Sequence, residues 1–476
     1  MTTSEERTYD VVVLGGGSTG ENVADVVVRG GLSAVLVENE LVGGECSYWA
    51  CMPSKALLRG TEVLAEARAV DGAAQAVTGG QDVAATLARR DEFTHSWDDS
   101  SQVHWAEQAG IDVVRGTGRL AGERTVVVTD AEGGQLRLTA RTAVAVCTGS
   151  VATLPPVDGL ADVHPWGPRE ATSAKEVPGR LLVLGGGYVG FEMATAWQAL
   201  GAQVTVLQRG DRLLPRAEPQ AGEAVTEALR AAGVEVVFGA DVTAARREGG
   251  DVVVTTAERE HRGDELLVAV GRAARTADLG LDSVGLEPGE YLPVDDTLQV
   301  EGRPWLYGIG DANGRSLLTH MGKYQARQAA AAILAQARGQ QADGAPWSAT
   351  AATADSVATP SVVFTDPQVA AVGRTAAQAA EEGLPHRVVE YPLGSIAGAS
   401  LHADGYTGTA IAVVDTEREV LLGVTFVGSG VAELLHAATI AVVGEVPISR
   451  LWHAVPSYPT MSEIWLRLLE TWRDGD

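Results

Sequence analysis

Two of the three cysteines lie five residues apart, within the segment GGECSYWACMPSK at 43–55. The residues that follow, ALLRGTEVLAEARAV, favour a helix, and a helix N-terminus stabilises a thiolate. A close cysteine pair in a cytosolic protein is more often catalytic than structural. Zinc binding is the alternative, but no second Cys or His pair has the spacing of zinc ligands. We therefore predict that Cys46 and Cys51 form a redox-active pair, that Cys147 is a buried apolar residue, and that the chain has no metal site.

A strand, a glycine turn and a helix occur twice in this chain, at a constant offset of 170 residues. The first copy runs from Val11 to Glu38 and the second from Leu181 to Gln208. Such a turn lets the backbone approach a pyrophosphate at the N-terminus of the helix, so we predict two dinucleotide sites. The matched glycines are Gly15, Gly17 and Gly20 in the first copy and Gly185, Gly187 and Gly190 in the second.

The two copies differ at the end of the second strand, where a ribose would lie. Glu38 stands 18 residues after Gly20, and a carboxylate there accepts hydrogen bonds from the ribose diol. The matching residue is Gln208, which is followed by Arg209, with two more arginines nearby. The missing acid and the arginines favour a 2′-phosphate, and hence NADP(H) over NAD(H). The alternative is that these arginines are merely solvated.

Composition limits the other functional classes. A chain of 476 residues, 45% of them hydrophobic, has material for two to four domains. A net charge of -26 offers no basic surface for nucleic acid. No run of about 18 uncharged apolar residues occurs, and no apolar signal segment precedes the first predicted strand at Val11. We therefore expect a cytoplasmic protein without nucleic-acid or membrane partners.

With further motifs added, the chain resembles the FAD-dependent pyridine nucleotide–disulfide oxidoreductases, which include dihydrolipoamide dehydrogenase, glutathione reductase and mercuric reductase. The resemblance covers nearly the whole chain. It implies that electrons pass from a nicotinamide through FAD to the cysteine pair. The additional motifs are CTGS at 147–150, GGGYVGFE at 185–192, AVGR at 269–272, YGIGD at 307–311, VVFTDPQVAAVG at 362–373 and PTMSE at 459–463.

The resemblance also implies roles for individual residues. Cys51 would be the charge-transfer thiol beside the flavin, and Cys46 the interchange thiol that meets the substrate. Lys55 would lie near the flavin and pair with Glu192, and Tyr188 would cover the nicotinamide site. The remaining residues expected at the cofactors are Gly44, Thr148, Gly149, Gly271, Gly310 and, at the ribityl chain of FAD, Asp311.

The implied fold is α/β, with two Rossmann-like dinucleotide-binding domains and a C-terminal α/β dimerisation domain. The FAD-binding domain would comprise residues 1–155 and 275–345, with the NAD(P)-binding domain, 156–274, inserted into it. The dimerisation domain would comprise 350–476, after the polar stretch ARGQQADGAPWSAT, which is typical of a linker. The resemblance further implies a homodimer with a shared active site, in which the partner's C-terminal segment faces the cysteines.

One motif departs from the family pattern. Dihydrolipoamide dehydrogenase and glutathione reductase carry an acid–base histidine before the Pro-Thr-x-Ser-Glu motif, oriented by its glutamate. Here PSYPTMSE places Tyr458 at the position of that histidine and keeps Glu463, whereas His453 lies five residues too early. A tyrosine is a poor base at neutral pH, so exchange with lipoamide or glutathione disulfide is expected to be slow. Mercuric reductase resembles this site in its tyrosine, but this chain lacks the C-terminal cysteine pair of that enzyme.

Three functions are compatible with the sequence. The favoured one is an NADPH-dependent reductase of a small disulfide or other thiol-reactive electron acceptor. The second is a diaphorase-type reductase of quinones, oxygen or metal ions, with the cysteine pair as electron store. The third is a non-catalytic flavoprotein redox sensor, which the complete nicotinamide-binding half argues against.

Overall fold

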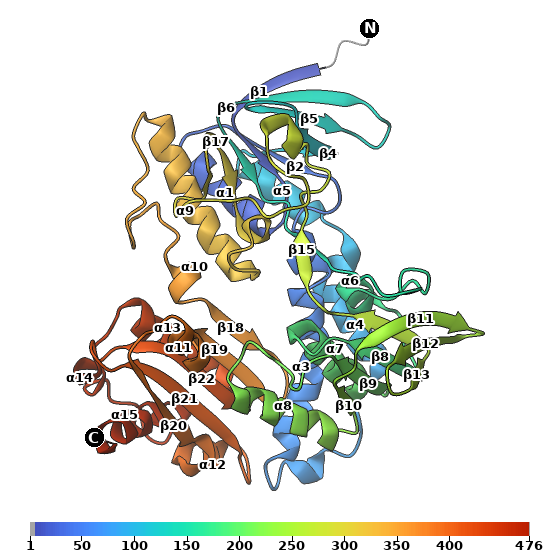
Figure 1. The fold of residues 1–476 in the computed structure, drawn as a ribbon, viewed down its shortest axis with the longest axis vertical. Helices are drawn as coiled ribbons and strands as arrows, with labels where there is room; N and C mark the ends of the chain where they lie inside the picture. Colours follow the sequence, from blue (N-terminus) through green and yellow to red (C-terminus); the bar gives the residue numbers. More distant parts are fainter. Residues whose placement is uncertain (1–4, 476) are drawn as a thin grey trace. The chain divides into compact units, whose positions relative to one another are not determined.

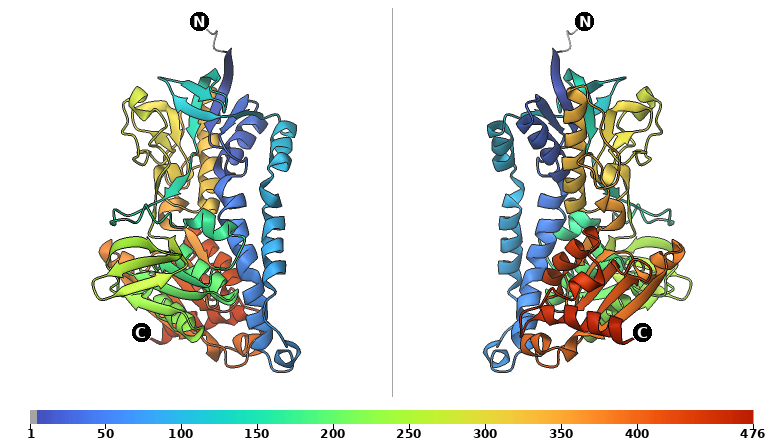
Figure 2. Two further views of the ribbon diagram at one scale, coloured as in Figure 1. Left: turned by 90° about the vertical axis from the view of Figure 1, so that its right-hand side faces the viewer. Right: turned by 90° about the vertical axis from the view of Figure 1, so that its left-hand side faces the viewer.

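The computed structural model describes residues 5–475, and Figures 1 and 2 show its elements. The chain divides into two compact units, each assembled from three separate stretches. The first contains the residues up to Pro53, Asp91–Ala152 and Arg272–Ser356; the second contains Ser54–Arg90, Thr153–Gly271 and the residues from Val357 onward. The residue bounds expected for the FAD-binding, NAD(P)-binding and dimerisation domains remain predictions. Among residues 5–475, no helix has both the length and the apolar character needed to cross a membrane.

A largely parallel sheet forms the centre of the first unit. Its central strands are ordered β16-β17-β6-β1-β2-β3. The pairs from β17 to β3 are parallel, whereas β16–β17 and the added pairs β4–β5 and β5–β6 are antiparallel. β1 begins at Glu5, six residues before the expected Val11, because the long strand β6 pairs with it as far as Leu136. The strands span Glu5–Leu14 (β1), Ala34–Glu38 (β2), Asp112–Arg115 (β3), Gln135–Val146 (β6), Gln299–Val300 (β16) and Arg303–Gly308 (β17).

Helices α1 (Ser18–Arg29) and α9 (Thr319–Ala337) pack side by side against this sheet (Figure 1). Their buried apolar residues, such as Val23 of α1 and Ile333 of α9, share one core with β1 and β6. The packing brings the first turns of both helices to the carboxyl ends of the parallel strands, which is where open α/β sheets bind ligands. The remaining elements of this unit include α5 (Ser100–Gln108) beside β3, the hairpin β4 (Thr117–Leu120) and β5 (Thr125–Thr129) paired with β6, and the pair β7 (Ser150–Ala152) and β15 (Arg272–Ala274).

The second unit contains a four-stranded parallel sheet of order β10-β9-β8-β14. Helices α7 (Tyr188–Ala199) and α8 (Pro219–Ala231) pack on it through residues such as Trp197 and Val225, which belong to the same core. The strands span Arg180–Leu184 (β8), Gln203–Gln208 (β9), Glu235–Phe238 (β10) and Glu265–Val268 (β14), and an antiparallel sheet adds Val242–Glu248 (β11), Asp251–Thr256 (β12) and Glu260–Gly263 (β13).

The repeat in the sequence is also a repeat in the structure. α1 and α7 have 12 residues each, and their first residues keep the offset of 170. The glycines that open the two turns have nearly equal φ angles, 103° at Gly15 and 107° at Gly185. The predicted strand–turn–helix unit is therefore confirmed in both copies.

The C-terminal part of the second unit is an antiparallel sheet of order β18-β19-β22-β21-β20. Helix α13 (Leu435–Val443) packs on β19 and β22, and α15 (Ile464–Asp474) packs on β20 and β21. Helices α3 (Cys51–Arg68) and α4 (Val83–Phe93) run side by side (Figure 2), joined by a hydrogen bond from Arg89 to the carbonyl of Ala56. The sheet strands span Pro360–Val363 (β18), Gln368–Gly373 (β19), His386–Pro392 (β20), Gly408–Asp415 (β21) and Leu421–Gly428 (β22).

Candidate active site

The two close cysteines lie on consecutive helices of the glycine-rich segment. Cys46 is in the short helix α2 (Gly44–Tyr48), and Cys51 is the first residue of α3. Both cysteines are half-buried. The Cys51 sulfur lies 3.3 Å from the hydroxyl oxygen of Thr319, the first residue of α9. A hydroxyl donor and the positive end of a helix dipole both favour negative charge on that sulfur.

The surroundings of Cys46 raise the pKa of its thiol. A hydrogen bond with Cys51 raises the pKa of the Cys46 thiol, and burial raises it further, against smaller opposing effects of Thr319 and Lys323. Within the pair, Cys46 is therefore a thiol that gives up its proton with difficulty. The division into an interchange thiol and a charge-transfer thiol stays a prediction.

Three residues near the cysteines were not singled out by the sequence as site residues. Thr319 contacts Cys51, and Lys323 lies one helical turn further along α9, within electrostatic reach of Cys46 and Glu21. Burial raises the pKa of Glu21 on α1 to about 7, opposed by Lys323 and reinforced by Glu38. Lysine occurs only three times in this chain, which is the one sequence signal at Lys323, and no local motif marks Thr319 or Glu21.

The first glycine turn has the shape of a pyrophosphate cradle. A Cβ atom on Gly15 would lie 2.4 Å from the carbonyl oxygen of Cys147, and one on Gly20 would lie 1.9 Å from the carbonyl oxygen of Gly15. The chain therefore passes too close for any side chain at these two positions. Glu38 accepts a hydrogen bond of 2.7 Å from the N–H of Gly16, which places its carboxylate at the turn.

Other residues expected at FAD surround the same turn. Gly44 of α2 approaches Gly17, since a Cβ atom on Gly44 would lie 2.7 Å from the Cα of Gly17. The buried hydroxyl of Thr148 has no hydrogen-bond partner among the described residues, and a Cβ on Gly149 would meet open space. An unpaired buried donor beside open space at a phosphate-type turn fits a bound dinucleotide. Cys147 is buried at the end of β6, as predicted.

Asp311 lies just beyond the end of β17, in the sheet of the first unit. It follows Gly310 in the short 3₁₀ turn Gly310–Asn313, and it accepts a hydrogen bond of 2.5 Å from the hydroxyl of Ser150. Burial raises the pKa of Asp311, while Ser150 and Arg272 oppose that rise. Arg272 in turn donates to the Ser150 hydroxyl at 2.6 Å. Ser150 of the CTGS motif and Arg272 of the AVGR motif thus position the carboxylate of Asp311 in the YGIGD motif.

The second glycine turn repeats this geometry in the second unit. A Cβ on Gly185 would lie 2.5 Å from the carbonyl oxygen of Ala269, and one on Gly190 would lie 2.0 Å from that of Gly185, whereas Gly187 faces open space. Gln208 accepts a hydrogen bond of 2.9 Å from the N–H of Gly186, as Glu38 does from Gly16. The amide of Gln208 therefore replaces the carboxylate of Glu38 in the structure as well as in the sequence.

The arginines beyond Gln208 are available to a ligand to different degrees. Arg209 is exposed at the end of β9, and Arg216 is exposed as well. Arg212 is half-buried and donates a hydrogen bond of 2.7 Å to the carbonyl of Pro215. Arg209 is thus the guanidinium best placed by position and exposure to meet a charged group at the end of this strand.

A half-buried ion pair joins α3 and α7 of the second unit. The ammonium of Lys55 donates to both carboxylate oxygens of Glu192, at 2.9 and 2.7 Å, and lies 4.9 Å from the ring centre of Phe364. Tyr188, at the start of α7, has its hydroxyl 3.3 Å from that of Ser361. The pairing of Lys55 with Glu192 that the resemblance implied is present. Gly271, also expected at a cofactor, accepts a backbone hydrogen bond of 3.0 Å from Thr153 through its carbonyl.

Tyr458 and Glu463, the two predicted site residues of the C-terminal motif, lie in different environments. The side chain of Tyr458 is 77% exposed, whereas Glu463 is buried. Glu463 accepts hydrogen bonds from Arg467 at 2.6 Å and from the N–H of Ala397 at 3.3 Å. Within residues 5–475, no hydrogen bond joins Glu463 to Tyr458. The carboxylate that orients the histidine in relatives is therefore engaged by Arg467 in this chain.

Known proteins match this chain along almost its entire length. The family described as pyridine nucleotide-disulphide oxidoreductase matches residues 9–335, and the dimerisation domain of that family matches residues 359–468. A mercuric reductase from Acidithiobacillus ferrooxidans is 30% identical over 471 residues, covering 97% of this chain and 82% of that protein. A dihydrolipoyl dehydrogenase from Haloferax volcanii is 29% identical, covering 97% of this chain and 95% of that protein.

A solved structure shares the fold. The HOCl-induced flavoprotein disulfide reductase RclA from Escherichia coli superposes with a TM-score of 0.81 at 25% identity. The match covers 97% of this chain and 99% of that chain. The α/β fold with a dinucleotide-binding region and a C-terminal dimerisation domain, predicted from the sequence, is thereby confirmed.

Proposed function

Because the chain belongs to the pyridine nucleotide-disulphide oxidoreductase family, we propose that it transfers electrons from NADPH, by way of FAD, to the Cys46–Cys51 disulfide and on to a small disulfide or other thiol-reactive acceptor. Bound FAD would take up the hydride of the nicotinamide and deliver its electron pair. The bond between the two sulfurs breaks as the pair gains two electrons, and it forms again as the same electrons reduce the acceptor.

The asymmetry of the cysteine pair is the observation that carries this proposal. Cys51 contacts the Thr319 hydroxyl at the N-terminus of α9, and the hydrogen bond with Cys51 raises the pKa of the Cys46 thiol. A sulfur that carries charge suits electron exchange with a flavin, while the neighbouring thiol must lose its proton before it attacks an acceptor. In this proposal FAD is held by Gly15, Gly17, Gly20, Gly44, Glu38, Thr148, Gly149, Gly310 and Asp311.

The proposal is tested by replacing the two thiols one at a time. Cys51→Ser should lose the long-wavelength absorption of a thiolate beside the flavin after reduction with two electrons. Cys46→Ser should keep that absorption and lose at least 99% of its turnover with disulfide acceptors, because no thiol is left to attack them. Cys147→Ser is the matched control and should keep both. If the two active-site variants reduce the acceptor as fast as the parent, the pair does not conduct the electrons.

We further propose a preference for NADPH over NADH. A contact between Arg209 and a 2′-phosphate would contribute roughly 1.5–3 kcal/mol, or about ten- to a hundredfold in affinity. Arg209→Glu should therefore remove the preference in kcat/KM. Gln208→Glu keeps an acceptor for the Gly186 N–H and adds a carboxylate for a ribose diol, so it should improve NADH use. Arg216→Glu serves as the control for charge alone, and equal use of both cofactors by the parent would contradict the proposal.

A second candidate function is reduction of metal ions, quinones or oxygen. Two observations favour it: Glu463 is committed to Arg467 and so cannot orient a base at Tyr458, and a 30% identical relative is named mercuric reductase. A panel of acceptors distinguishes the candidates when the NADPH-reduced protein is assayed before and after thiol alkylation. Disulfide reduction should stop on alkylation, whereas quinone and oxygen reduction directly from the flavin should persist.

A further inference from the structure

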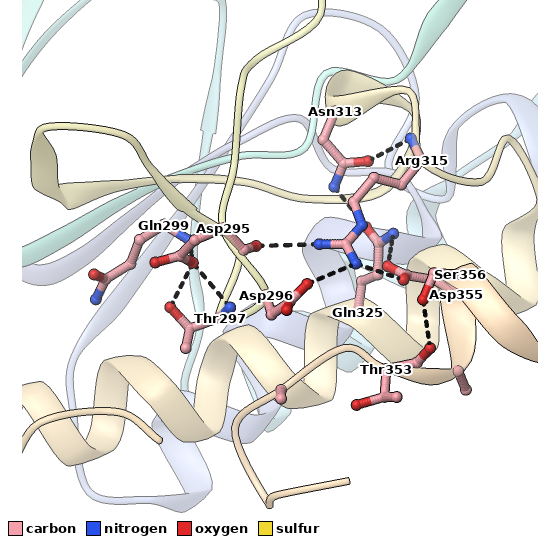
Figure 3. Close-up of polar contacts among 12 residues, drawn as sticks. Asp295, Asp296, Thr297, Gln299, Asn313, Arg315, Gln325, Thr353, Asp355 and Ser356 are labelled. Atoms are coloured by element: carbon pink, nitrogen blue, oxygen red, sulfur yellow. Dashed lines mark hydrogen bonds and ion pairs between the residues drawn. The ribbon is translucent and has the colours of Figure 1, made fainter. Parts of the chain in front are cut away.

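A buried cluster of polar side chains supports the turn that carries Asp311 (Figure 3). Gln325 lies on α9, is fully buried, and accepts two hydrogen bonds through its carbonyl oxygen. One comes from the N–H of Gly310 at 2.7 Å and the other from the side-chain amide of Asn313 at 2.8 Å. Asn313 also donates to the carbonyl of Gly308 at 2.9 Å, so both ends of the turn are tied to one amide group.

The other end of the Gln325 amide meets a buried carboxylate. Its NH₂ group donates to Asp355 at 2.8 Å, and the side chain of Asp355 is completely shielded from solvent. Arg315 donates to the second oxygen of Asp355 at 2.9 Å and to Asp296 at 3.1 Å. Burial raises the pKa of Asp355, and Arg315 and Gln325 oppose that rise. Removing one partner of such a buried pair leaves an uncompensated charge, which is costly.

The hydrogen-bond directions in this cluster are fixed. The N–H of Gly310 can only donate, and an ionised Asp355 can only accept, so Gln325 must present its oxygen to the turn and its nitrogen to Asp355. The turn has little room to adjust on its other side, because a Cβ on Gly310 would lie 2.9 Å from the hydroxyl of Thr19 on α1. The position of Asp311 thus depends on a chain of contacts that reaches Asp355, 44 residues later.

We propose that Gln325 and Asp355 are positioning residues for the FAD site: together they hold the Gly310–Asp311 turn in the conformation that binds the ribityl chain. This proposal rests on the assignment of Asp311 to FAD made above. Ser150 fixes the carboxylate of Asp311 from one side, and the Gln325–Asp355 pair fixes its backbone from the other. Both residues act through the turn, and through it they determine how long FAD remains bound.

The test exchanges the hydrogen-bonding roles of Gln325, which donates, and Asp355, which accepts. Gln325→Glu places the new carboxylate against that of Asp355. Asp355→Asn replaces an oxygen that accepts from Gln325 or from Arg315 with an NH₂ group, which can only donate. Each single variant should release FAD from the holoenzyme about tenfold faster or more, measured by the recovery of flavin fluorescence. In the double variant Gln325→Glu/Asp355→Asn, the amide nitrogen of the new asparagine donates to the new glutamate, so release should return to within about threefold of the parent.

Controls separate this proposal from a general loss of stability and from the assignment of Asp311. Gln336→Glu makes the same change on the same helix, where the side chain accepts from Tyr307, and should leave FAD release unchanged. Asp311→Asn should accelerate release on its own. Single variants that lower the unfolding temperature but release FAD at the parental rate would overturn the proposal, as would a double variant that is not rescued. Unchanged release from Asp311→Asn would instead refute the FAD assignment of Asp311.

Discussion

At the scale of single residues, we propose that Tyr458 and Glu463 determine which acceptors this site can serve. Tyr458 is exposed, and it offers a phenol hydroxyl where the family motif offers an imidazole. Glu463 is paired with Arg467 one helical turn away. A histidine introduced at position 458 would therefore lack the carboxylate that orients it in relatives.

This arrangement gives a two-step prediction. Tyr458→His alone should raise turnover of lipoamide or glutathione disulfide only a few-fold, because Glu463 stays with Arg467. Tyr458→His combined with Arg467→Gln should release the carboxylate and raise turnover by about 10²-fold, within the usual range for general acid–base help. The gain should fall away below about pH 6.5 as the new imidazole becomes protonated. Arg467→Gln without the histidine is the control, and efficient disulfide turnover by the parent enzyme would contradict this account.

At the scale of secondary-structure elements, the two strand–turn–helix units provide matched sites for one substitution. A Cβ at Gly20 or at Gly190 would lie about equally close to the carbonyl oxygen at the start of its turn, 1.9 and 2.0 Å respectively. Each helix can pack this tightly on its strand only because that glycine lacks a side chain. The same mutation should therefore damage one nucleotide site at a time.

We predict opposite phenotypes for the two variants. Gly190→Ala should yield a yellow protein whose flavin is reduced by dithionite at the parental rate but by NADPH at least a hundredfold more slowly. Gly20→Ala should yield a protein with less than a tenth of the parental FAD. Absorbance at the flavin band and stopped-flow reduction provide the measurements. Loss of FAD from Gly190→Ala would show that the two units are not independent in ligand binding.

At the scale of the whole molecule, the C-terminal part exposes apolar side chains that a soluble monomer would normally bury. Leu401 is 69% exposed, Ile440 58% and Val455 86%, in the region that matches the dimerisation domain of the family. Together with the match to a dimerisation domain, these exposed side chains favour association of two copies. With Tyr458 only three residues from Val455, a homodimer would place that tyrosine at or near the interface.

We predict a dimer in solution whose active site depends on association. Val455→Asp should raise the dissociation constant of the dimer at least tenfold, because it would bury a charge without a partner. Acceptor turnover should fall in proportion to the monomer fraction, while reduction of the flavin by NADPH should persist. Val388→Asp, on the exposed side of β20, is the control for added charge. Sedimentation across a protein dilution series measures the equilibrium, and full acceptor turnover by monomers would contradict a shared site.

The sequence by itself determined the elements whose chemistry is local. The glycine turns, Glu38 opposite Gln208 and the spacing of Cys46 and Cys51 are all encoded within about 30 residues, because turn geometry and helix packing leave few residue types that fit. The replacement of the acid–base histidine by Tyr458 came only from the resemblance to the family, and it stays a prediction. The full length of β1 was not visible, since its first residues are ordered only by pairing with β6, more than 100 residues later.

Only the tertiary structure decided which residues support those motifs from a distance. Thr319 reaches Cys51 because α9 packs beside α1. Asp355 stabilises the Gly310–Asp311 turn through Gln325, although nothing in its local sequence marks it. Such roles depend on burial and on a partner's hydrogen-bonding direction. These properties arise when distant segments pack together, and no local pattern encodes them.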